Sequence, residues 1–293
     1  MKPHILILGS SGFIGGAVTA YLQRIHAGEI QSLSSRMLDL TEEEAWKQLA
    51  GFFREQTHLF VSVRPRRTPY CEFAFSTHMQ MAATVARAVR AKKIAQCILV
   101  SSTSVYGEGA GETSVAEQAV CQPATIYGIA KLSEEQLIRF SAERARTPFL
   151  ALRPAMLFGE TAAADSYGPS RFLRAISSHA AVEIFGSGRE RRNYLDIEDF
   201  AEIAARLLKT SATGVMNVAP SEHWSFRELA MQLEAASGGP ITTVEVERAR
   251  PAGSLILDTR RFQSAVPGFK FRPLSESLKR AYAAYAAEAA RTQ

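Results

Sequence analysis

Short apolar segments alternate with longer amphipathic segments along the first half of the chain. The short segments have the length and composition of buried parallel strands, and the longer ones repeat their apolar side chains at helical spacing. The pattern predicts strands at about residues 4–8, 30–34, 59–63 and 97–100, and helices at about 13–27, 42–53 and 76–92. Thr41-Glu42-Glu43-Glu44 predicts a capping box for the second of these helices. Strands and helices that alternate in this order predict a doubly wound parallel α/β sheet.

The alternation loosens after about residue 155, where a polar stretch at 160–170 predicts the start of a smaller lobe. We expect residues 1–154 to form the first domain, with a return to it at about 194–219, and residues 155–293 to form mainly the second lobe. Helices are predicted at 170–178, 199–208, 226–236 and from about 275, and strands at 215–218 and 242–246. The alanine-rich last helix is expected on the surface, docked or against another subunit.

Three glycines occupy the turn between the first predicted strand and the first predicted helix. Glycine at such a turn permits positive φ and close approach of a ligand to the backbone. The helix that follows presents unpaired N–H groups and the positive end of its dipole, which together suit a pyrophosphate. A plain tight turn is the alternative, but the position favours the dinucleotide site of a Rossmann domain. We expect the cofactor to contact Gly9, Ser11, Gly12, Phe13, Ile14 and Gly15.

The tip of the second predicted strand reads Ser34-Ser35-Arg36 and contains no acidic residue. An acid there accepts hydrogen bonds from the ribose of NAD, whereas arginine with small polar neighbours suits a 2′-phosphate. We therefore predict an NAD(P) site that slightly favours NADP over NAD, with contacts from Ser35 and Arg36. Two alternatives stay open: Arg36 lies solvated in a loop, and Asp39 meets the adenine.

A tyrosine and a lysine four residues apart, Tyr127 and Lys131, open a predicted helix. At this spacing both side chains face the same way, and an ammonium beside a phenol favours the phenolate. A serine-rich segment that includes Ser102 follows the strand at 97–100 and places a hydroxyl nearby. The three groups suit proton exchange in an alcohol-to-ketone reaction. We predict that Ser102, Tyr127 and Lys131 form the catalytic unit.

With these pieces in this order, the chain resembles the extended short-chain dehydrogenase/reductases, in the NAD-dependent epimerase/dehydratase branch that acts mostly on nucleotide sugars. The resemblance covers nearly the whole chain. It is carried by Gly9, Gly12, Gly15, Ser102, Tyr127, Lys131, the Leu-Arg-Pro of 152–154, the segment 186–199 with Arg192, and the strand 214–218.

The resemblance implies a role for each of these side chains. Tyr127 would exchange a proton with the substrate hydroxyl, Ser102 would share that proton or orient the oxygen, and Lys131 would hold the ribose of the cofactor and depress the pKa of Tyr127. Arg192 would contact the nucleotide diphosphate, and Thr103 is expected at the substrate. Thr103 and Ser104 stand where dehydratases of the family carry Asp-Glu, so a 4,6-dehydratase is disfavoured. A homodimer through two helices beside the Tyr127 helix is also implied.

We therefore expect an NAD(P)-dependent oxidoreductase or epimerase that acts on a nucleotide sugar, either a 4-keto reductase or a 4-epimerase. Two alternatives remain: an NADPH-dependent reductase of a non-nucleotide carbonyl compound, and a non-catalytic protein of the same fold that senses the cofactor.

Composition limits the partners, ligands and cellular compartment that are expected for this chain. Hydrophobic residues make up 46% and charged residues 22% of the 293 residues, which is ordinary for a globular protein. The net charge of +5 comes without a lysine-rich helix or zinc-finger spacing, so a nucleic-acid partner is not expected. No apolar run has the length of a membrane span, and the six histidines lack ligand spacing for a metal. Three dispersed cysteines and a predicted strand that begins near Met1 predict a cytoplasmic protein without a signal peptide.

Overall fold

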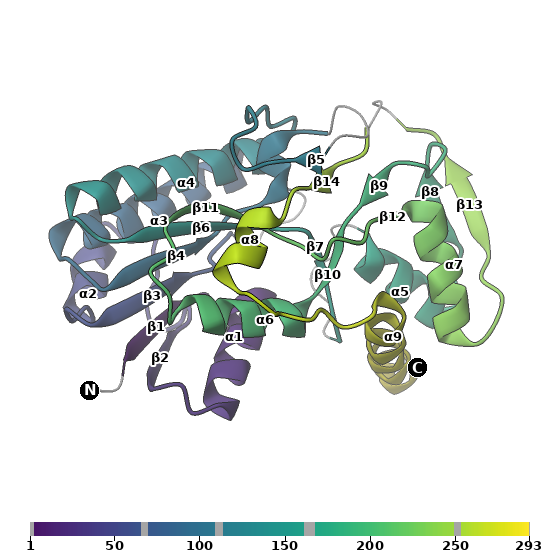
Figure 1. Cartoon of the computed structure of the whole chain (residues 1–293), viewed down its shortest axis with the longest axis horizontal. Helices are drawn as coiled ribbons and strands as arrows, with labels where there is room; N and C mark the ends of the chain where they lie inside the picture. The colour runs from purple at the N-terminus through teal and green to yellow at the C-terminus, as the bar shows by residue number, and fades with distance from the viewer. Residues whose placement is uncertain (1–2, 66–69, 109–113, 161–167, 249–252, 293) are drawn as a thin grey trace.

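The computed structural model describes residues 3–65, 70–108, 114–160, 168–248 and 253–292. Its centre is a six-stranded parallel sheet in the order β11-β6-β4-β3-β1-β2 (Figure 1). The strands are β1 (His4–Leu8), β2 (Glu29–Leu33), β3 (Thr57–Val61), β4 (Gln96–Val100), β6 (Phe149–Pro154) and β11 (Gly214–Val218). The strand order reverses beside β1, because β2 and β3 pair with its two opposite edges. The predicted doubly wound sheet is therefore confirmed.

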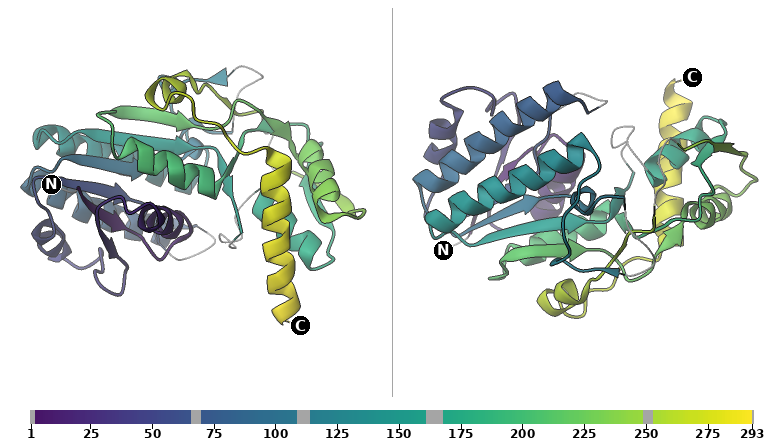
Figure 2. Two further views of the ribbon diagram at one scale, coloured as in Figure 1. Left: turned by 60° about the horizontal axis from the view of Figure 1, so that its bottom comes forward. Right: turned by 90° about the horizontal axis from the view of Figure 1, so that it is seen from above.

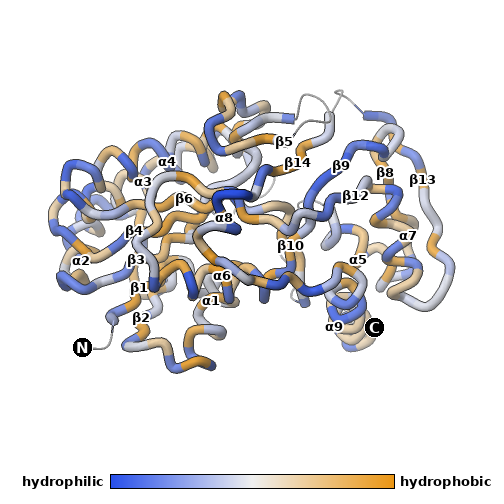
Figure 3. Tube along the Cα trace, in the orientation of Figure 1, coloured by the Kyte–Doolittle hydropathy of each residue, from blue (hydrophilic) through white to orange (hydrophobic). Residues whose placement is uncertain are grey.

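Helices cover both faces of this sheet, as the views in Figure 2 show. Alternate residues of β1 face opposite sides, so Ile5 and Ile7 join one hydrophobic cluster while Leu6 and Leu8 join another. The first cluster includes side chains of α1 (Phe13–Arg24) and α6 (Ile197–Leu207). The second includes side chains of α2 (Ala45–Gly51), α3 (Glu72–Ala91) and α4 (Ile126–Arg144). Figure 3 shows the resulting hydrophobic sheet between more polar helix surfaces.

A second lobe has a hydrophobic cluster of its own, which includes Phe172, Leu229 and Leu278. Its elements are β7 (Met156–Phe158), α5 (Pro169–Ser177), β8 (Val182–Phe185), β10 (Tyr194–Asp196), α7 (Phe226–Ser237), β13 (Thr243–Val246) and α9 (Leu274–Thr292). The remaining short elements are η1 (Thr103–Tyr106), β5 (Ser114–Val115), β9 (Arg191–Arg192), β12 (Trp224–Ser225), β14 (Ile256–Leu257) and α8 (Arg260–Ala265). Leu255, Leu257, Phe262 and Val266 pack into the first cluster beside the sheet, so the chain also returns there after the lobe.

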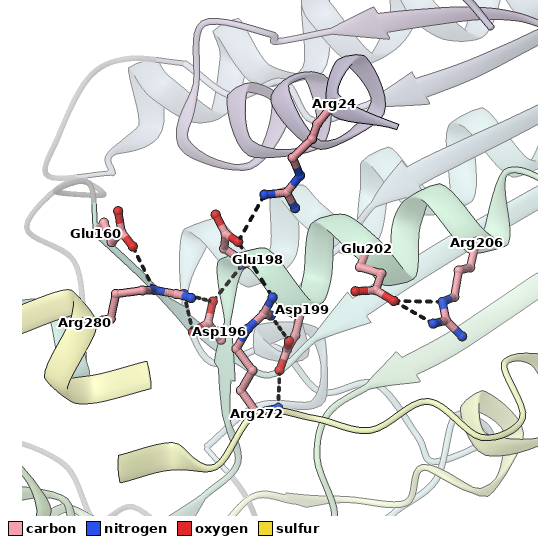
Figure 4. Close-up of polar contacts among 9 residues, drawn as sticks. All are labelled: Arg24, Glu160, Asp196, Glu198, Asp199, Glu202, Arg206, Arg272 and Arg280. Carbon is pink, nitrogen blue, oxygen red and sulfur yellow. Dashed lines mark hydrogen bonds and ion pairs between the residues drawn. The ribbon is translucent and has the colours of Figure 1, made fainter. Parts of the chain in front are cut away.

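The last helix, α9, docks against α5 and α7, which was one of the two arrangements expected for it. Two arginines tie this end of the chain to the start of α6, as Figure 4 shows. Arg280 donates to both carboxylate oxygens of Asp196 at 2.9 and 2.7 Å, and the backbone N–H of Arg272 donates to Asp199 at 2.9 Å. Burial raises the pKa of Asp199, against the pull of Arg272. The two aspartates therefore join the lobes.

Two local predictions differ from the structure. The helix α2 begins at Ala45 without a side-chain cap, so the capping box at residues 41–44 was wrong. The reason is a competing bond, because the hydroxyl and backbone N–H of Thr41 both donate to Asp39. The third strand lies two residues earlier than predicted, because its pairing with β1 begins at Thr57 opposite His4.

Candidate active site

A cleft of about 1590 Å³ lies at the carboxyl ends of the parallel strands. It includes the ends of β1 and β3, between which the strand order reverses, the usual ligand position in open α/β sheets. The cleft brings together many side chains that the sequence placed in a site. They are Gly9, Ser11, Gly12, Phe13, Ile14, Ser35, Asp39, Ser102, Thr103, Tyr127 and Arg192.

The glycine turn is closely packed, and a side chain does not fit at Gly9 or Gly15. Gly9 has φ +83°, and a Cβ atom there would lie 2.6 Å from the carbonyl oxygen of Ser62. A Cβ atom on Gly15 would lie 2.2 Å from the carbonyl oxygen of Gly9, so Gly15 acts in packing and is absent from the cleft wall. The N-cap, Gly12, supplies no side-chain hydrogen bond to the first turn of α1. The turn therefore fits the pyrophosphate of a dinucleotide.

The end of β2 contributes Ser35 and Asp39 to the cleft wall, whereas Arg36 is exposed and lies outside that wall. Asp39 accepts hydrogen bonds from the backbone and hydroxyl of Thr41 at 2.9 and 2.7 Å, and these bonds lower its pKa. Asp39 is thus held as a carboxylate beside the cleft. Of the basic loop after β3, Arg64 is exposed and lines the cleft, while Arg66 and Arg67 lie outside the described residues.

The predicted catalytic residues come from the end of β4 and the start of α4. Ser102 precedes the short helix η1, and its hydroxyl accepts a hydrogen bond from the backbone N–H of Ser104 at 3.1 Å. Thr125 caps α4 by accepting from the backbone N–H of Gly128 at 3.0 Å. This cap starts the helix just before Tyr127, which lines the cleft together with Ser102.

Gly128 allows α4 to approach the turn that carries Ser102. A Cβ atom on Gly128 would lie 2.5 Å from the carbonyl oxygen of Ser104. We expect Gly128→Ala to push the helix away from the turn, and misplacement by about 1 Å costs catalysis on the order of 10²-fold. The measurement is kcat beside a thermal unfolding curve. Gly51→Ala serves as the control, since nothing lies within 4 Å of a Cβ atom there. Equal rates in the two variants would contradict the role of this close approach.

Lys131 lies behind the cleft wall, where it is buried and pairs with Glu134. Glu134 also contacts the buried His78, whose other ring nitrogen contacts the hydroxyl of Tyr70. Glu134, His78 and Tyr70 were not among the predicted site residues, although the i, i+3 spacing of Lys131 and Glu134 on a helix was a signal for the pair.

Arg192 reaches the cleft wall from β9, and one of its guanidinium nitrogens donates to the carbonyl oxygens of Arg191 and Gly253. Burial lowers its pKa. Arg191 points elsewhere, to Glu228 at 2.9 Å, so the structure separates these two arginines.

The neighbouring Asn193 is buried. Its amide group donates to the carbonyl oxygens of Pro220 and Glu222 at 3.0 Å, and its oxygen accepts from Leu257 at 2.9 Å. An aspartate cannot donate these two bonds.

Three polar side chains, Arg153, Tyr106 and Asn217, support the end of the sheet. Arg153 makes two hydrogen bonds to the buried Glu135, at 3.1 and 2.7 Å, and stacks over the ring of Tyr106. The hydroxyl of Tyr106 donates to Asn217 at 2.7 Å. These polar side chains are buried and satisfied by one another, so they hold the strands on which the cleft is built.

Within the residues that the structure describes, no helix is both long and apolar enough to cross a membrane. The same described part of the chain contains no group of three or more His, Cys, Asp or Glu side chains arranged to hold a metal ion.

The fold and cleft define a dinucleotide-binding protein of the Rossmann class. The sequence profile of the NAD dependent epimerase/dehydratase family matches residues 5–219. The chain therefore belongs to this family of enzymes.

One curated relative matches a smaller part of the chain than the family profile does. The chain is 32% identical over 161 residues to a dTDP-4-dehydro-6-deoxy-D-allose reductase of Streptomyces bikiniensis, a match that covers 52% of this chain and 48% of the relative. The chain thus spans about half the length of the curated relatives it matches in this way.

Two solved structures share the fold over almost their whole length. A UDP-N-acetylglucosamine 4-epimerase from Methanobrevibacter ruminantium M1, in complex with UDP-N-acetylmuramic acid, superposes with a TM-score of 0.84 at 19% identity, covering 98% of this chain and 100% of that one. The RMD protein from Pseudomonas aeruginosa, complexed with NADPH, superposes with a TM-score of 0.84 at 20% identity, covering 98% and 99%. At such identities the likeness establishes the fold.

Proposed function

We propose that this chain is an NADPH-dependent reductase of a 4-keto sugar linked to a nucleoside diphosphate. The observation that carries the proposal is the shared cleft, in which Tyr127, Ser102 and Thr103 line the same space as the glycine turn. The relative from Streptomyces bikiniensis is a reductase of a dTDP-linked 4-keto sugar by its name, which supports this reaction.

Each residue then has a defined task. Tyr127 donates a proton to the ketone oxygen as that oxygen becomes an alcohol, and Ser102 orients the oxygen through its hydroxyl. Lys131 supplies positive charge behind Tyr127, which favours release of the proton. Thr103 contacts the sugar, and Arg192 offers guanidinium hydrogen bonds to the diphosphate.

The residues that would hold the dinucleotide are those of the glycine turn that line the cleft, together with Ser35 and Asp39. A contact of Lys131 with the ribose stays a prediction, because Lys131 is buried behind the cleft wall. The nicotinamide supplies the hydride for the reaction, whereas the protein supplies placement and charge. The preference for NADP stays a prediction, because it was based on Arg36, which is exposed outside the cleft wall.

The proposal is tested first by ligand binding and then by turnover. We expect dTDP, UDP or GDP to raise the melting temperature of the purified chain, since a ligand that binds only the folded state stabilises it. The matching 4-keto sugar should then oxidise one NADPH for each product molecule. If no nucleoside diphosphate stabilises the chain while a nucleotide-free ketone is reduced, the substrate class is wrong.

A 4-epimerase is the second candidate, and the exposed position of Arg36 favours it, because the cleft wall then needs no 2′-phosphate. In that case the same Ser102, Tyr127 and Lys131 would remove and return one proton without net consumption of cofactor. Conversion of a UDP-sugar without any change in NADPH absorbance would replace the reductase by the epimerase.

The homodimer and the cytoplasmic location remain predictions. Ile129, Leu137 and Phe140 on α4 are exposed large apolar side chains, and they support a second copy of the chain as the partner of this helix.

A further inference from the structure

Four polar side chains form a continuous chain of contacts beside the cleft: Lys131, Glu134 and His78 are buried between α3 and α4, and Tyr70, just ahead of α3, lines the cleft wall. The ammonium of Lys131 contacts one carboxylate oxygen of Glu134, and the Nε2 atom of His78 lies 3.2 Å from that same oxygen. The other ring nitrogen of His78 lies 2.6 Å from the hydroxyl of Tyr70. The ring of Tyr70 packs edge-on against Tyr127 with their centroids 5.4 Å apart. The chain of contacts therefore begins and ends at the proposed catalytic pair.

The burial of Glu134 lowers the stability of the fold, which suggests that this carboxylate has a functional role. Its side chain is 0% exposed, as is that of His78. Among the described residues, neither its oxygen Oε1 nor the Nε2 atom of His78 has a hydrogen-bond partner, so the 3.2 Å contact between Nε2 and Oε2 is an electrostatic contact. A buried carboxylate that is only partly satisfied costs free energy, and such groups gather at functional sites. Burial acts to raise the pKa of Glu134, but Lys131 and His78 hold that pKa below its usual value.

We propose that Glu134 is the positioning residue and counter-ion of Lys131, and that His78 and Tyr70 hold it in place. The proposal rests on the proposed function, because it assigns Glu134 to the same Tyr127–Lys131 pair. The carboxylate fixes the direction of the ammonium and balances its charge where water is excluded.

The ionisable groups around Glu134 come from several elements. Glu135, on the same helix, is already engaged by Arg153 and Ser101. Burial raises the pKa of Cys97 on β4 to about 12, so this thiol stays neutral. The groups that face Glu134 or its partners are Tyr127 and Lys131 on α4, His78 on α3, Arg64, Tyr70 and Cys71 ahead of α3, and Cys97.

Charge alone gives the direction in which removal of the Glu134 carboxylate should change proton loss from Lys131 and Tyr127. A negative charge beside an ammonium and a phenol favours the state in which both keep their protons. Without that charge, either group loses its proton more easily. In a variant without that charge, the first proton is therefore expected to leave at lower pH, whichever of the two groups releases it.

The test is Glu134→Gln, which removes the charge and keeps the shape. In the cofactor-free chain, NMR of ¹³Cζ-tyrosine and ¹³Cε-lysine follows the pair, with resonances assigned by their loss in Tyr127→Phe and Lys131→Met. We expect the first deprotonation to move to lower pH by about one unit or more. The alkaline limb of kcat/KM for ketone reduction should move in the same direction. Glu143→Gln, an exposed acid on the same helix, should leave both unchanged.

If Glu134→Gln does not fold, Glu134→Asp takes its place. Aspartate keeps the negative charge but is one methylene shorter, so the charge lies farther from Lys131 and the pH of the first deprotonation should fall by a smaller amount. A first deprotonation at the wild-type pH in the folded variants would overturn the proposal. The NMR shift without turnover of any 4-keto sugar by the wild type would support the role of Glu134 and refute the proposed function. If the wild type turns over a 4-keto sugar but neither the NMR titration nor the alkaline limb of kcat/KM shifts in Glu134→Gln, the proposed function is supported and the role of Glu134 is refuted.

Discussion

Tyr127→Phe is expected to lower kcat for ketone reduction by about 10²–10⁴-fold, because general acid–base groups contribute on this order. The substitution removes one oxygen from a side chain that lines the cleft and keeps the ring that packs against Tyr70. The fold and the affinity for the dinucleotide should therefore change little. Stopped-flow measurement of hydride transfer, with cofactor binding measured separately, distinguishes loss of chemistry from loss of binding.

Tyr106→Phe is the matched control for this experiment. Tyr106 belongs to the same end of the sheet, but its hydroxyl donates to Asn217 and burial raises its pKa to about 12. Its loss should lower stability by about 1–3 kcal/mol, since a buried acceptor is left without its donor. The rate per folded molecule should be retained. A pH–rate profile of Tyr127→Phe that matches the wild type would remove the acid–base role from Tyr127.

Glu135→Ala is expected to destabilise the fold by about 3–5 kcal/mol, the usual cost of leaving one member of a buried ion pair alone. Glu135 is 0% exposed and Arg153 2% exposed, and the two make a bidentate contact. Burial works against the charge of Arg153, yet the bonds to Glu135 hold its pKa above the usual value. Urea unfolding followed by circular dichroism measures the loss.

Two control variants test whether the loss of stability in Glu135→Ala comes from the buried ion pair. Glu143→Ala removes an exposed acid on the same helix, 3.9 Å from Arg139, and such surface pairs contribute about 0–1 kcal/mol. The double replacement Glu135→Met with Arg153→Met removes both charges and should cost less than Glu135→Ala alone. If Glu135→Ala loses no more stability than Glu143→Ala, the buried pair does not support the sheet end as described.

Local patterns predicted the elements that carry the cleft. The apolar runs of β1 and β4 and the helical spacing after Tyr127 each lie within a few residues, so their periods are visible in the chain itself. The glycine turn was predictable for the same reason, because positive φ at Gly9 is a local demand on the backbone. Local patterns did not predict the start of α2 correctly. The hydroxyl of Thr41 donates to Asp39, so it does not cap the helix as predicted.

Contacts between distant segments were not predictable in this way. His78 and Glu134 are far apart in the sequence, and each alone looked like an ordinary helix residue until α3 packed against α4. Arg36 had the right residue type for a 2′-phosphate, but only the path of the chain after β2 placed it outside the cleft wall.

The sequence by itself determined the parallel sheet, the glycine turn, the Tyr127–Lys131 spacing and, through its collinear motifs, the family. These features depend on backbone conformation and periodicity over short stretches. Tertiary structure alone decided that Glu134 faces His78, that Glu135 faces Arg153, and that residues 255–266 return to the sheet. The reason is physical, since a charge or an apolar side chain acquires its partner only when packing brings distant segments together.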